Sequence, residues 1–281
     1  MDASRSPLFC DVNLARRIEQ AEAQLITECS RASQGRTGAT TGFVTSVAGG
    51  VASFAESDSP FNKVAGLGFS GVPSAAEMDE IEEAFAACGS EVQIELAHLG
   101  DPEIGTFLTE RGYRLVSFEN VLGRALDRVE RVTPPGIEVR PSNDDEFEAW
   151  LAVVVDATLH PDTQGVPWHE EFPRQILEDA ERDATAAGVT RYTARRDGVI
   201  AGGASLRMAD GIAQLTGAAT AFEHRRRGVQ TALTSARLAD AASAGCDIAV
   251  VTTQPGSKSQ QNVQRQGFDL LYTRAVLVKQ S

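Results

Sequence analysis

The sequence predicts an α/β protein with a mixed sheet, built from two similar halves. Segments of helical periodicity alternate with short apolar segments that suit strands. The order of these segments occurs twice, at an offset of 155 positions that brings Gly112-Tyr113 onto Gly267-Phe268. Between the copies, residues 127–136 contain Val-Thr-Pro-Pro-Gly, and a double proline resists both helix and strand. We therefore expect two domains, residues 1–130 and residues 136–281.

The first half opens with an amphipathic helix over residues 12–33, because its apolar residues recur on one side. Gly49-Gly50 suits a hairpin turn. Ser74 followed by Glu77 has the spacing of a capping box and marks the start of another helix. The expected elements after the first helix are strands at 42–48, 50–56 and 64–69, a helix at 75–88, a strand at 91–97, a helix at 102–111 and a strand at 113–122.

The second half repeats this order. Asp197-Gly198 and Asp210-Gly211 have the composition of two-residue hairpin turns between strands. The expected elements are a strand at 137–140, helices at 144–158 and 168–187, strands at 191–196, 199–207 and 212–222, a helix at 229–244, a strand at 248–253, a helix at 258–266 and a strand at 268–279.

The composition is that of a globular protein with a strong excess of acidic residues. The formal net charge of −13 disfavours nucleic acid and anionic membranes as partners. The four cysteines are scattered without CxxC spacing, so neither a disulfide framework nor a metal site is expected. No signal peptide and no membrane-spanning apolar segment stand out. We expect a cytoplasmic monomer or homodimer.

One stretch stands out against this acidic background. Residues 212–222 suit a buried strand, three arginines and Gly228 follow, and a helical pattern opens at Val229. The free amides and the dipole at a helix N-terminus favour an anion, and glycine allows close backbone approach. We expect a phosphate or pyrophosphate site, with a solvated basic turn as the alternative. The first copy has Ser70-Gly71-Val72-Pro73-Ser74 there, without arginine, so the second half is expected to be the working domain.

From about residue 137 to residue 279 the chain resembles the GNAT superfamily of N-acyltransferases. The acyl-CoA loop of that family, Gln/Arg-x-x-Gly-x-Gly/Ala, is matched by Arg225-Arg226-Arg227-Gly228-Val229-Gln230, with Gln230 in place of the usual small residue. The family often has a tyrosine four residues before the later glycine, as the acid for the departing thiolate, and here that position is Val263. The layout is similar to that of the mycothiol synthase family and related double-GNAT proteins.

The resemblance implies two GNAT-like domains in tandem, the first degenerate, each with a central, mostly antiparallel sheet flanked by helices. It implies transfer of an acetyl group from acetyl-CoA, as co-substrate, to an amine of a small molecule or peptide, without a metal. The residues expected to bind acetyl-CoA are Ala219, Thr220, Ala221, Arg225, Arg226, Arg227, Gly228, Val229, Gln230, Thr231, Ser259 and Asn262.

Three residues are candidates for proton transfer. Glu223 and His224 lie beside the arginine loop and are chemically able to deprotonate an amine, with a solvated loop residue as the alternative for each. Tyr272 is the nearest tyrosine downstream of Val263, although a strand tyrosine also suits the core. An acceptor pocket could be lined by His160, Trp168, His169 and Glu170.

A second function class stays open on the sequence. The valine at position 263 and Gln230 at the end of the loop also suit a CoA-binding regulatory or interaction module that has lost catalysis. A P-loop nucleotide enzyme is disfavoured, because Gly228-Val229-Gln230-Thr231 lacks the Gly-Lys-Ser/Thr step.

Overall fold

The strands of the protein form one continuous sheet. The structure is a computed structural model that describes residues 6–38, 42–127, 129–161, 165–166 and 171–280. In it 11 strands follow the order β1-β2-β3-β4-β11-β5-β10-β9-β8-β7-β6. Their bounds are β1 Phe43–Val47, β2 Gly50–Phe54, β3 Lys63–Ala65, β4 Val92–Ala97, β5 Arg114–Ala125, β6 Ile137–Pro141, β7 Thr190–Arg196, β8 Val199–Ala209, β9 Ile212–Thr220, β10 Ile248–Thr253 and β11 Asp269–Lys279.

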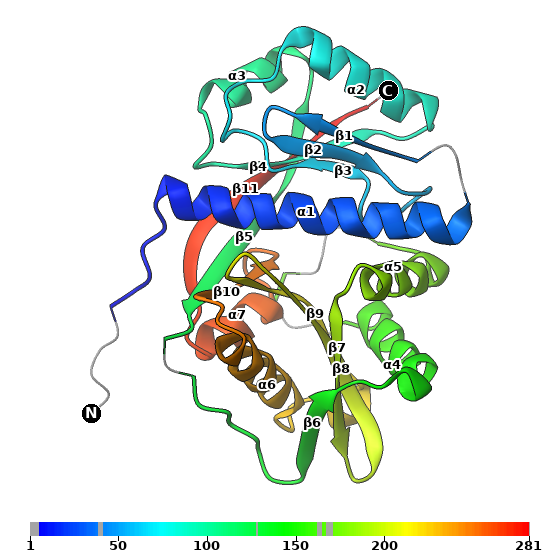
Figure 1. Ribbon diagram of the computed structural model, residues 1–281, viewed down its shortest axis with the longest axis vertical. Helices are drawn as coiled ribbons and strands as arrows, with labels where there is room; N and C mark the ends of the chain where they lie inside the picture. The colour runs from blue at the N-terminus through cyan, green and yellow to red at the C-terminus, as the bar shows by residue number, and fades with distance from the viewer. Residues whose placement is uncertain (1–5, 39–41, 128, 162–164, 167–170, 281) are drawn as a thin grey trace.

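Helices cover both faces of this sheet. On β8 a Cβ added at Gly203 would meet Trp150 of α4, and one added at Gly202 would meet Val229 of α6, so these helices pack on opposite faces. Helix α1 lies across the middle of the molecule, between the two halves (Figure 1). The helices are α1 Val12–Thr37, α2 Ala75–Ala87, α3 Glu103–Glu110, α4 Phe147–Leu159, α5 Arg174–Ala186, α6 Val229–Ser243 and α7 Lys258–Arg265.

The order of elements recurs as the sequence predicts. Helices α3 and α7 begin at Glu103 and Lys258 and end at Glu110 and Arg265, so both ends agree at an offset of 155 positions. Strands β5 and β11 also begin 155 positions apart. The connection between β5 and β6 contains the expected boundary near residues 130–136.

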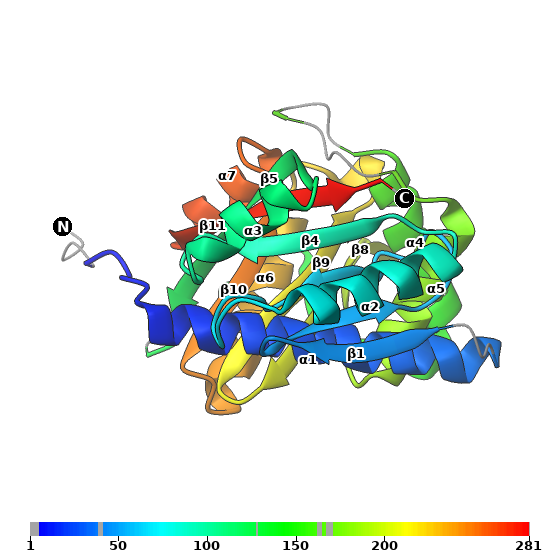
Figure 2. The ribbon, with the colours of Figure 1, turned by 90° about the horizontal axis from the view of Figure 1, so that it is seen from above.

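The two halves do not have separate sheets, however, because they exchange their last strands. Strand β11 lies between β4 and β5 and runs antiparallel to both. Strand β5 in turn pairs antiparallel with β10 of the second half. Each copy is therefore completed by the strand that ends the other copy, and Figures 1 and 2 show the long β5 and β11 side by side across the molecule. Residues 136–281 alone lack two strands that their own β10 and β11 need.

A buried ion network ties α1 to this exchange. The fully buried Arg274 of β11 donates from Nε to Glu19 of α1 at 2.8 Å. Its other nitrogens lie 3.5 Å from Glu95 of β4 and 3.7 Å from Glu119 of β5. Removing one partner of such a buried pair typically costs about 3–5 kcal/mol, because the remaining charge has no compensation. The network thus fixes α1 against strands of both halves.

Most of the expected elements agree with the structure to within a few residues. The turns at Asp197-Gly198 and Asp210-Gly211 have the positive φ angles of a two-residue hairpin turn. Helix α5 is shorter than expected: it begins at Arg174 because Pro173 is extended, and residues 171–172 before it are not helical. Among the described residues, no helix combines the length and the apolar character needed to cross a bilayer.

The strand exchange predicts that the second half does not fold alone. A fragment of residues 136–281 is expected to aggregate or to show no cooperative unfolding, because β11 loses both neighbours and β10 loses one. Co-expression with residues 1–130 is expected to restore a 1:1 complex, since β5 and β11 complete each other. Circular dichroism and size-exclusion chromatography check this, and a monomeric, cooperatively folded fragment would contradict it.

Candidate active site

The site begins where two neighbouring parallel strands separate. Pairing of β9 with β10 runs from Ile212 opposite Ile248 to Gln214 opposite Val250 and then stops. Both strands continue, β9 to Thr220 and β10 to Thr253. Thr216 and Ala218 are consequently exposed, although they lie in a strand in the interior of the sheet.

Backbone amides of β9 point into this gap. Ala221 donates its amide to Ala201 on the β8 side at 3.0 Å. Because ladder bonds alternate along an antiparallel pair, the amides of Ala218 and Thr220 point away from β8, toward the side that β10 has left. A ligand in extended conformation can pair with them there.

A buried arginine stabilises the backbone irregularity beside the gap. The register of β8 and β9 shifts between Ser205 and Arg207, which leaves ladder carbonyls without strand partners. Arg237 of α6 is fully buried and donates to the carbonyls of Ser205 and Gly217, both at 2.9 Å. Burial lowers the pKa of Arg237. The residue was not singled out in the sequence, although it lies four positions after Leu233 of the apolar stripe, where a charge is unexpected.

The turn before α6 has the geometry of an anion site. Arg226 and Gly228 have φ angles of 61° and 87°, and Gly228 is the N-cap of α6 without a side-chain capping bond. Among the described residues no side chain caps the first amides of α6, so these amides can donate to a bound anion. A Cβ at Gly228 would also meet Pro134 at 3.1 and 3.2 Å, and the expected close approach of the backbone to a ligand stays a prediction. Gly228 is thus required by its φ angle and by the segment between the two halves.

A cavity of about 730 Å³ opens at this helix end and between β9 and β10. Four cationic side chains line it, namely Arg225, Arg226, Lys258 and Arg265, and the described residues that line it include no Asp or Glu. In a chain with a net charge of −13 this is a local concentration of positive charge. Ten of the twelve residues expected to bind acetyl-CoA line the cavity: Ala219, Thr220, Arg225, Arg226, Gly228, Val229, Gln230, Thr231, Ser259 and Asn262. Ala221 and Arg227 do not line it.

Arg225 forms hydrogen bonds to backbone carbonyls of the protein. Its guanidinium donates to the carbonyls of Ala157 and Thr220 at 3.3 Å and to that of His160. These bonds hold the C-terminus of α4, where backbone carbonyls lack helical partners, against the loop before α6. Arg225 therefore positions the wall of the cavity in addition to contributing charge.

The short helix α7 presents polar side chains to the same cavity. Ser257 is its N-cap and accepts the amide of Gln260 at 3.2 Å. Ser259 thus does not serve as the cap, and both Ser259 and Asn262 line the cavity. Val263 is buried in the core with Phe268, so the position at which the resemblance places an acid faces the interior.

The comparisons with known proteins agree with this geometry. The model of the acetyltransferase (GNAT) family matches residues 152–268, which include α5, β7 to β10, α6 and α7. Residues 152–268 form a GNAT domain. Among curated proteins, none matches the sequence.

Solved structures extend the similarity to nearly the whole chain. A GCN5-related N-acetyltransferase from Kribbella flavida has a TM-score of 0.68 at 23% identity, over 95% of this chain and 96% of that chain. A tandem GNAT protein from the clavulanic acid biosynthesis pathway has a TM-score of 0.59 at 13% identity, over 97% of both chains. At these identities the likeness concerns the fold, and the fold is that of a tandem GNAT protein.

The corresponding gap in the first half is closed. After β3 and β4, Gly68 and Gly100 are in backbone contact: a Cβ added at Gly68 would lie 3.0 Å from the Cα of Gly100. The amide of Asp101 also donates to the carbonyl of Gly68 at 2.8 Å. A ligand arm has no space to enter between these segments, in agreement with the absence of the arginine loop from this copy.

The expected catalytic residues have different positions. His224 lines the cationic cavity, and its buried Nδ1 has no hydrogen-bond partner among the described residues. Glu223 is exposed on the short turn Phe222–His224 and lines neither this cavity nor the second one described below. The roles of both residues stay predictions, and of the two only His224 lines a cavity.

Tyr272, the third candidate, does not line the cationic cavity, and its role as the acid stays a prediction. Its side chain is buried and its hydroxyl donates to Glu19 of α1 at 2.6 Å. Burial and the Glu19 carboxylate raise the pKa of Tyr272 well above its ordinary value. The tyrosine belongs to the ion network of the seam, because it lies two residues before Arg274 on the same face of β11.

Of the four residues expected to line an acceptor pocket, the structure describes only His160. Trp168, His169 and Glu170 lie outside the described residues, and His160 is exposed beyond the end of α4, where its Nδ1 contacts the carbonyl of Asp156 at 2.9 Å. The described part of the chain contains no group of three or more His, Cys, Asp or Glu side chains arranged to hold a metal ion.

A second cavity, of about 310 Å³, adjoins the gap from the other direction. Thr158 and Thr252 line both cavities, so the two spaces meet between α4 and β10. Its walls come from α1 and from the segment around Phe61 in the first half, and from α4, α5, β9 and β10 in the second. Sequence analysis did not find it, because these walls lie far apart in the chain.

The position of Tyr272 leads to a prediction. Tyr272→Phe is expected to leave acetyl transfer within about twofold of the unchanged protein and to lower the free energy of unfolding by about 0.5–1.5 kcal/mol, since a buried Glu19 oxygen loses one of its two donors and keeps Arg274. Urea unfolding and thiol release from acetyl-CoA measure the two effects. Tyr113→Phe is the matched control, because that hydroxyl also bonds a glutamate, Glu82, at 3.2 Å. A loss of turnover near 10²-fold with acetyl-CoA binding intact would show that Tyr272 is the acid.

Proposed function

We propose that this chain is an acetyl-CoA-dependent N-acetyltransferase that acts on an amine of a small molecule or peptide, with one acetyl-CoA site, in the second half. The observation that carries the proposal is the cationic cavity at the N-terminus of α6. Uncapped helix amides, four cationic side chains and the free amides of a separated strand open into that one space. A pyrophosphate with an extended amide arm has the matching chemistry.

The residues present fit this co-substrate. The amides of Val229, Gln230 and Thr231 would hold the pyrophosphate, and Ser259 and Asn262 of α7 would bond polar groups of the nucleotide. The amides of Ala218 and Thr220 would pair with the pantetheine arm as a strand partner pairs. Acetyl-CoA supplies a thioester whose carbonyl carbon can accept an amine.

The chain would accelerate the reaction mainly by positioning. Holding an amine beside an oriented carbonyl removes much of the entropic barrier of a bimolecular step. Val263 is buried and has no proton to donate, but a thiol with an ordinary pKa of about 8.5 gives a tolerable leaving group near neutral pH. A dedicated acid is therefore not required for turnover.

The test is a substitution that changes the charge at the N-terminus of α6 without destabilising the helix. Gln230→Glu is expected to weaken acetyl-CoA binding by about tenfold or more, equivalent to about 1.4 kcal/mol, because it adds an anion beside the pyrophosphate. A carboxylate in the first turn of α6 interacts favourably with the helix dipole and stabilises the helix, so the melting temperature without ligand should not fall. Isothermal titration calorimetry with acetyl-CoA measures the affinity.

Gln24→Glu on α1 is the control, because Gln24 is exposed on a helix and lines neither cavity. Absence of acetyl-CoA binding by the unchanged chain at millimolar concentration would contradict the proposal. Binding without turnover of any amine would favour a CoA-binding regulatory module instead.

The closed gap of the first half predicts the stoichiometry. Titration is expected to give one acetyl-CoA per chain, since backbone contact between Gly68 and Gly100 leaves no space for a second arm. A ratio of two equivalent sites per chain, or a ligand bound beside Gly68 in a crystal structure, would overturn this expectation.

A further inference from the structure

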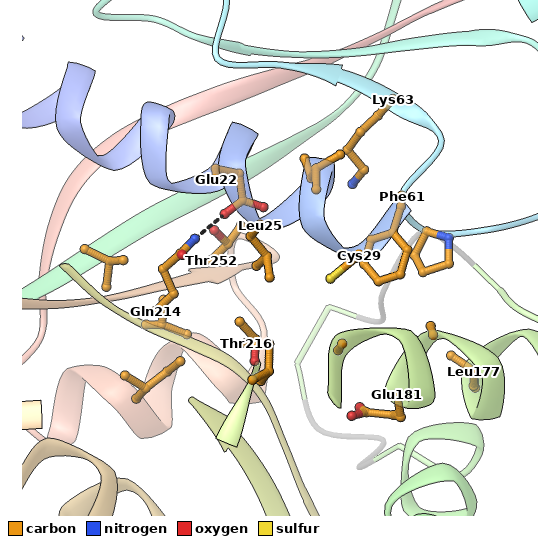
Figure 3. A pocket seen from close by; sticks show the side chains of 18 of the residues that line it. Glu22, Leu25, Cys29, Phe61, Lys63, Leu177, Glu181, Gln214, Thr216 and Thr252 are labelled. Carbon is orange, nitrogen blue, oxygen red and sulfur yellow. Dashed lines mark hydrogen bonds between the residues drawn. The ribbon is translucent and has the colours of Figure 1, made fainter. Parts of the chain in front are cut away.

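The second cavity has an apolar body and a charged lining. Most of its walls are aliphatic or aromatic, and side chains from α1, α5, β9 and the segment around Phe61 converge on one space (Figure 3). Its volume of about 310 Å³ is at the lower end of the range for ligand pockets. Because it meets the cationic cavity at Thr158 and Thr252, a molecule held in it lies beside the separated strands.

The two cations of its lining are already compensated. Lys63 is paired with Glu95, and Arg274 bonds Glu19 and lies within 4.0 Å of Glu22 and Glu95. Glu119 is a further buried carboxylate beside Arg274, and burial together with Glu95 raises the pKa of Glu119 to about 8. At that pKa Glu119 is mostly uncharged near neutral pH. The acidic groups of the lining are Glu22 and Glu181, and because Lys63 and Arg274 are paired with Glu95 and Glu19 outside the lining, these two carboxyls can attract a cationic ligand.

Glu181 of α5 approaches the separated strand from across the cavity. A Cβ added at Gly217 would lie 4.0 Å from its Oε1, so the carboxylate is next to the exposed Thr216 and Ala218. Burial raises the pKa of Glu181 to about 7, while a bond from the Ser205 hydroxyl opposes that rise. Such a carboxyl can both release and accept a proton near neutral pH.

The charged groups around Glu181 come from several elements. Arg191 of β7 lowers its pKa. Glu22 of α1, Lys63 of β3 and Arg274 of β11 line the same cavity. Glu22 accepts a bond from Gln214 Nε2 at 3.1 Å, which holds that carboxylate at the cavity wall (Figure 3).

We propose that this cavity receives the acceptor, a compact primary amine with an apolar body and no carboxylate, and that Glu181 takes the proton of its ammonium group. The inference rests on the N-acetyltransferase function proposed above. The Glu181 carboxylate accepts one proton from the ammonium ion, and the neutral nitrogen forms a bond to the acetyl carbon. The carbon–sulfur bond breaks, and the second nitrogen proton goes to the departing thiolate to give the thiol. The proton on Glu181 then passes to solvent.

The lining selects against other amine classes. An amino acid would bring its own carboxylate beside Glu22 and Glu181, and like charges in contact repel each other. A long polyamine would place a second ammonium group in contact with apolar side chains such as Leu25, Phe61 and Leu177. A compact monoamine satisfies both the carboxylates and the apolar walls.

The first arm of the test compares acceptors on the unchanged chain. 2-Phenylethylamine and phenylalanine differ by one carboxylate, and spermidine represents polyamines. Thiol release from acetyl-CoA is expected to give a kcat/KM for 2-phenylethylamine on the order of 10²-fold or more above that for phenylalanine, and above that for spermidine. A preference for phenylalanine or spermidine would overturn the inference.

The second arm removes the carboxylate. Glu181→Gln is expected to lower kcat/KM for the monoamine by about 10²–10⁴-fold and to abolish the rise of kcat/KM with pH through about 7. Its acetyl-CoA affinity should stay unchanged.

A carboxyl whose pKa is higher in the folded than in the unfolded state destabilises the fold above its unfolded pKa, so the melting temperature of the Glu181→Gln variant at pH 8 should be equal to or higher than that of the unchanged chain. Glu178→Gln is the control, because Glu178 lies on the same helix, is near Arg174 and lines neither cavity.

The third arm fills the cavity from the first half. Leu25→Trp is expected to raise the KM for 2-phenylethylamine on the order of tenfold or more, with acetyl-CoA affinity unchanged, whereas Gln24→Trp on the exposed side of α1 has no such effect. Unchanged amine kinetics and pH profile in Glu181→Gln and Leu25→Trp would overturn the inference and leave the proposed function standing. Failure of the unchanged chain to bind acetyl-CoA would instead remove the proposed function.

Discussion

The exchange of β5 and β11 is the constraint on which the rest of the structure depends. Because β11 lies between β4 and β5, neither half has a complete sheet, and the seam between the halves is a continuous set of ladder bonds. The same exchange brings Arg274 of the last strand against carboxylates of α1, β4 and β5. A buried arginine tolerates few geometries, so the network fixes α1 along the seam. Helix α1 thereby becomes a wall of a cavity whose other walls belong to the second half.

Charge is divided between two adjoining spaces. The cavity at α6 has four cationic side chains in its lining, whereas the cavity under α1 is lined by Glu22 and Glu181 and by two cations that are paired with Glu95 and Glu19. They meet at Thr158 and Thr252, where β9 and β10 have separated. An anionic co-substrate and a cationic acceptor would thus enter from opposite sides and meet where neither field dominates. Arg237 makes this meeting place possible, because it satisfies carbonyls that the irregular ladder leaves free.

Local chemistry explains what the sequence could predict. Periodicity, hairpin dipeptides and the Ser74 capping box act within a few residues, and they located nearly every helix and strand. The arginine loop was recognisable because a strand, a turn and a helix are contiguous there. The strand exchange was not predictable from the sequence. Strands β5 and β11 occupy equivalent positions in the two copies, and the order of elements does not decide which of them pairs with β4 and which with β10. Glu181, Glu22 and Arg237 were missed because each acts on a residue distant in the chain.

The contrast between the halves indicates what the first copy contributes. Its own gap is closed by the contact of Gly68 with Gly100, so it has no place for a ligand arm. It nevertheless supplies β4 and β5 to the sheet, and Leu25, Phe61 and Lys63 to the cavity beside the second copy. Loss of the arginine loop removes only a binding function, whereas loss of these strands or of α1 would open the seam and expose the buried ion network. A duplicated domain can therefore lose its own site and still be required, because it has become the wall of its partner's site.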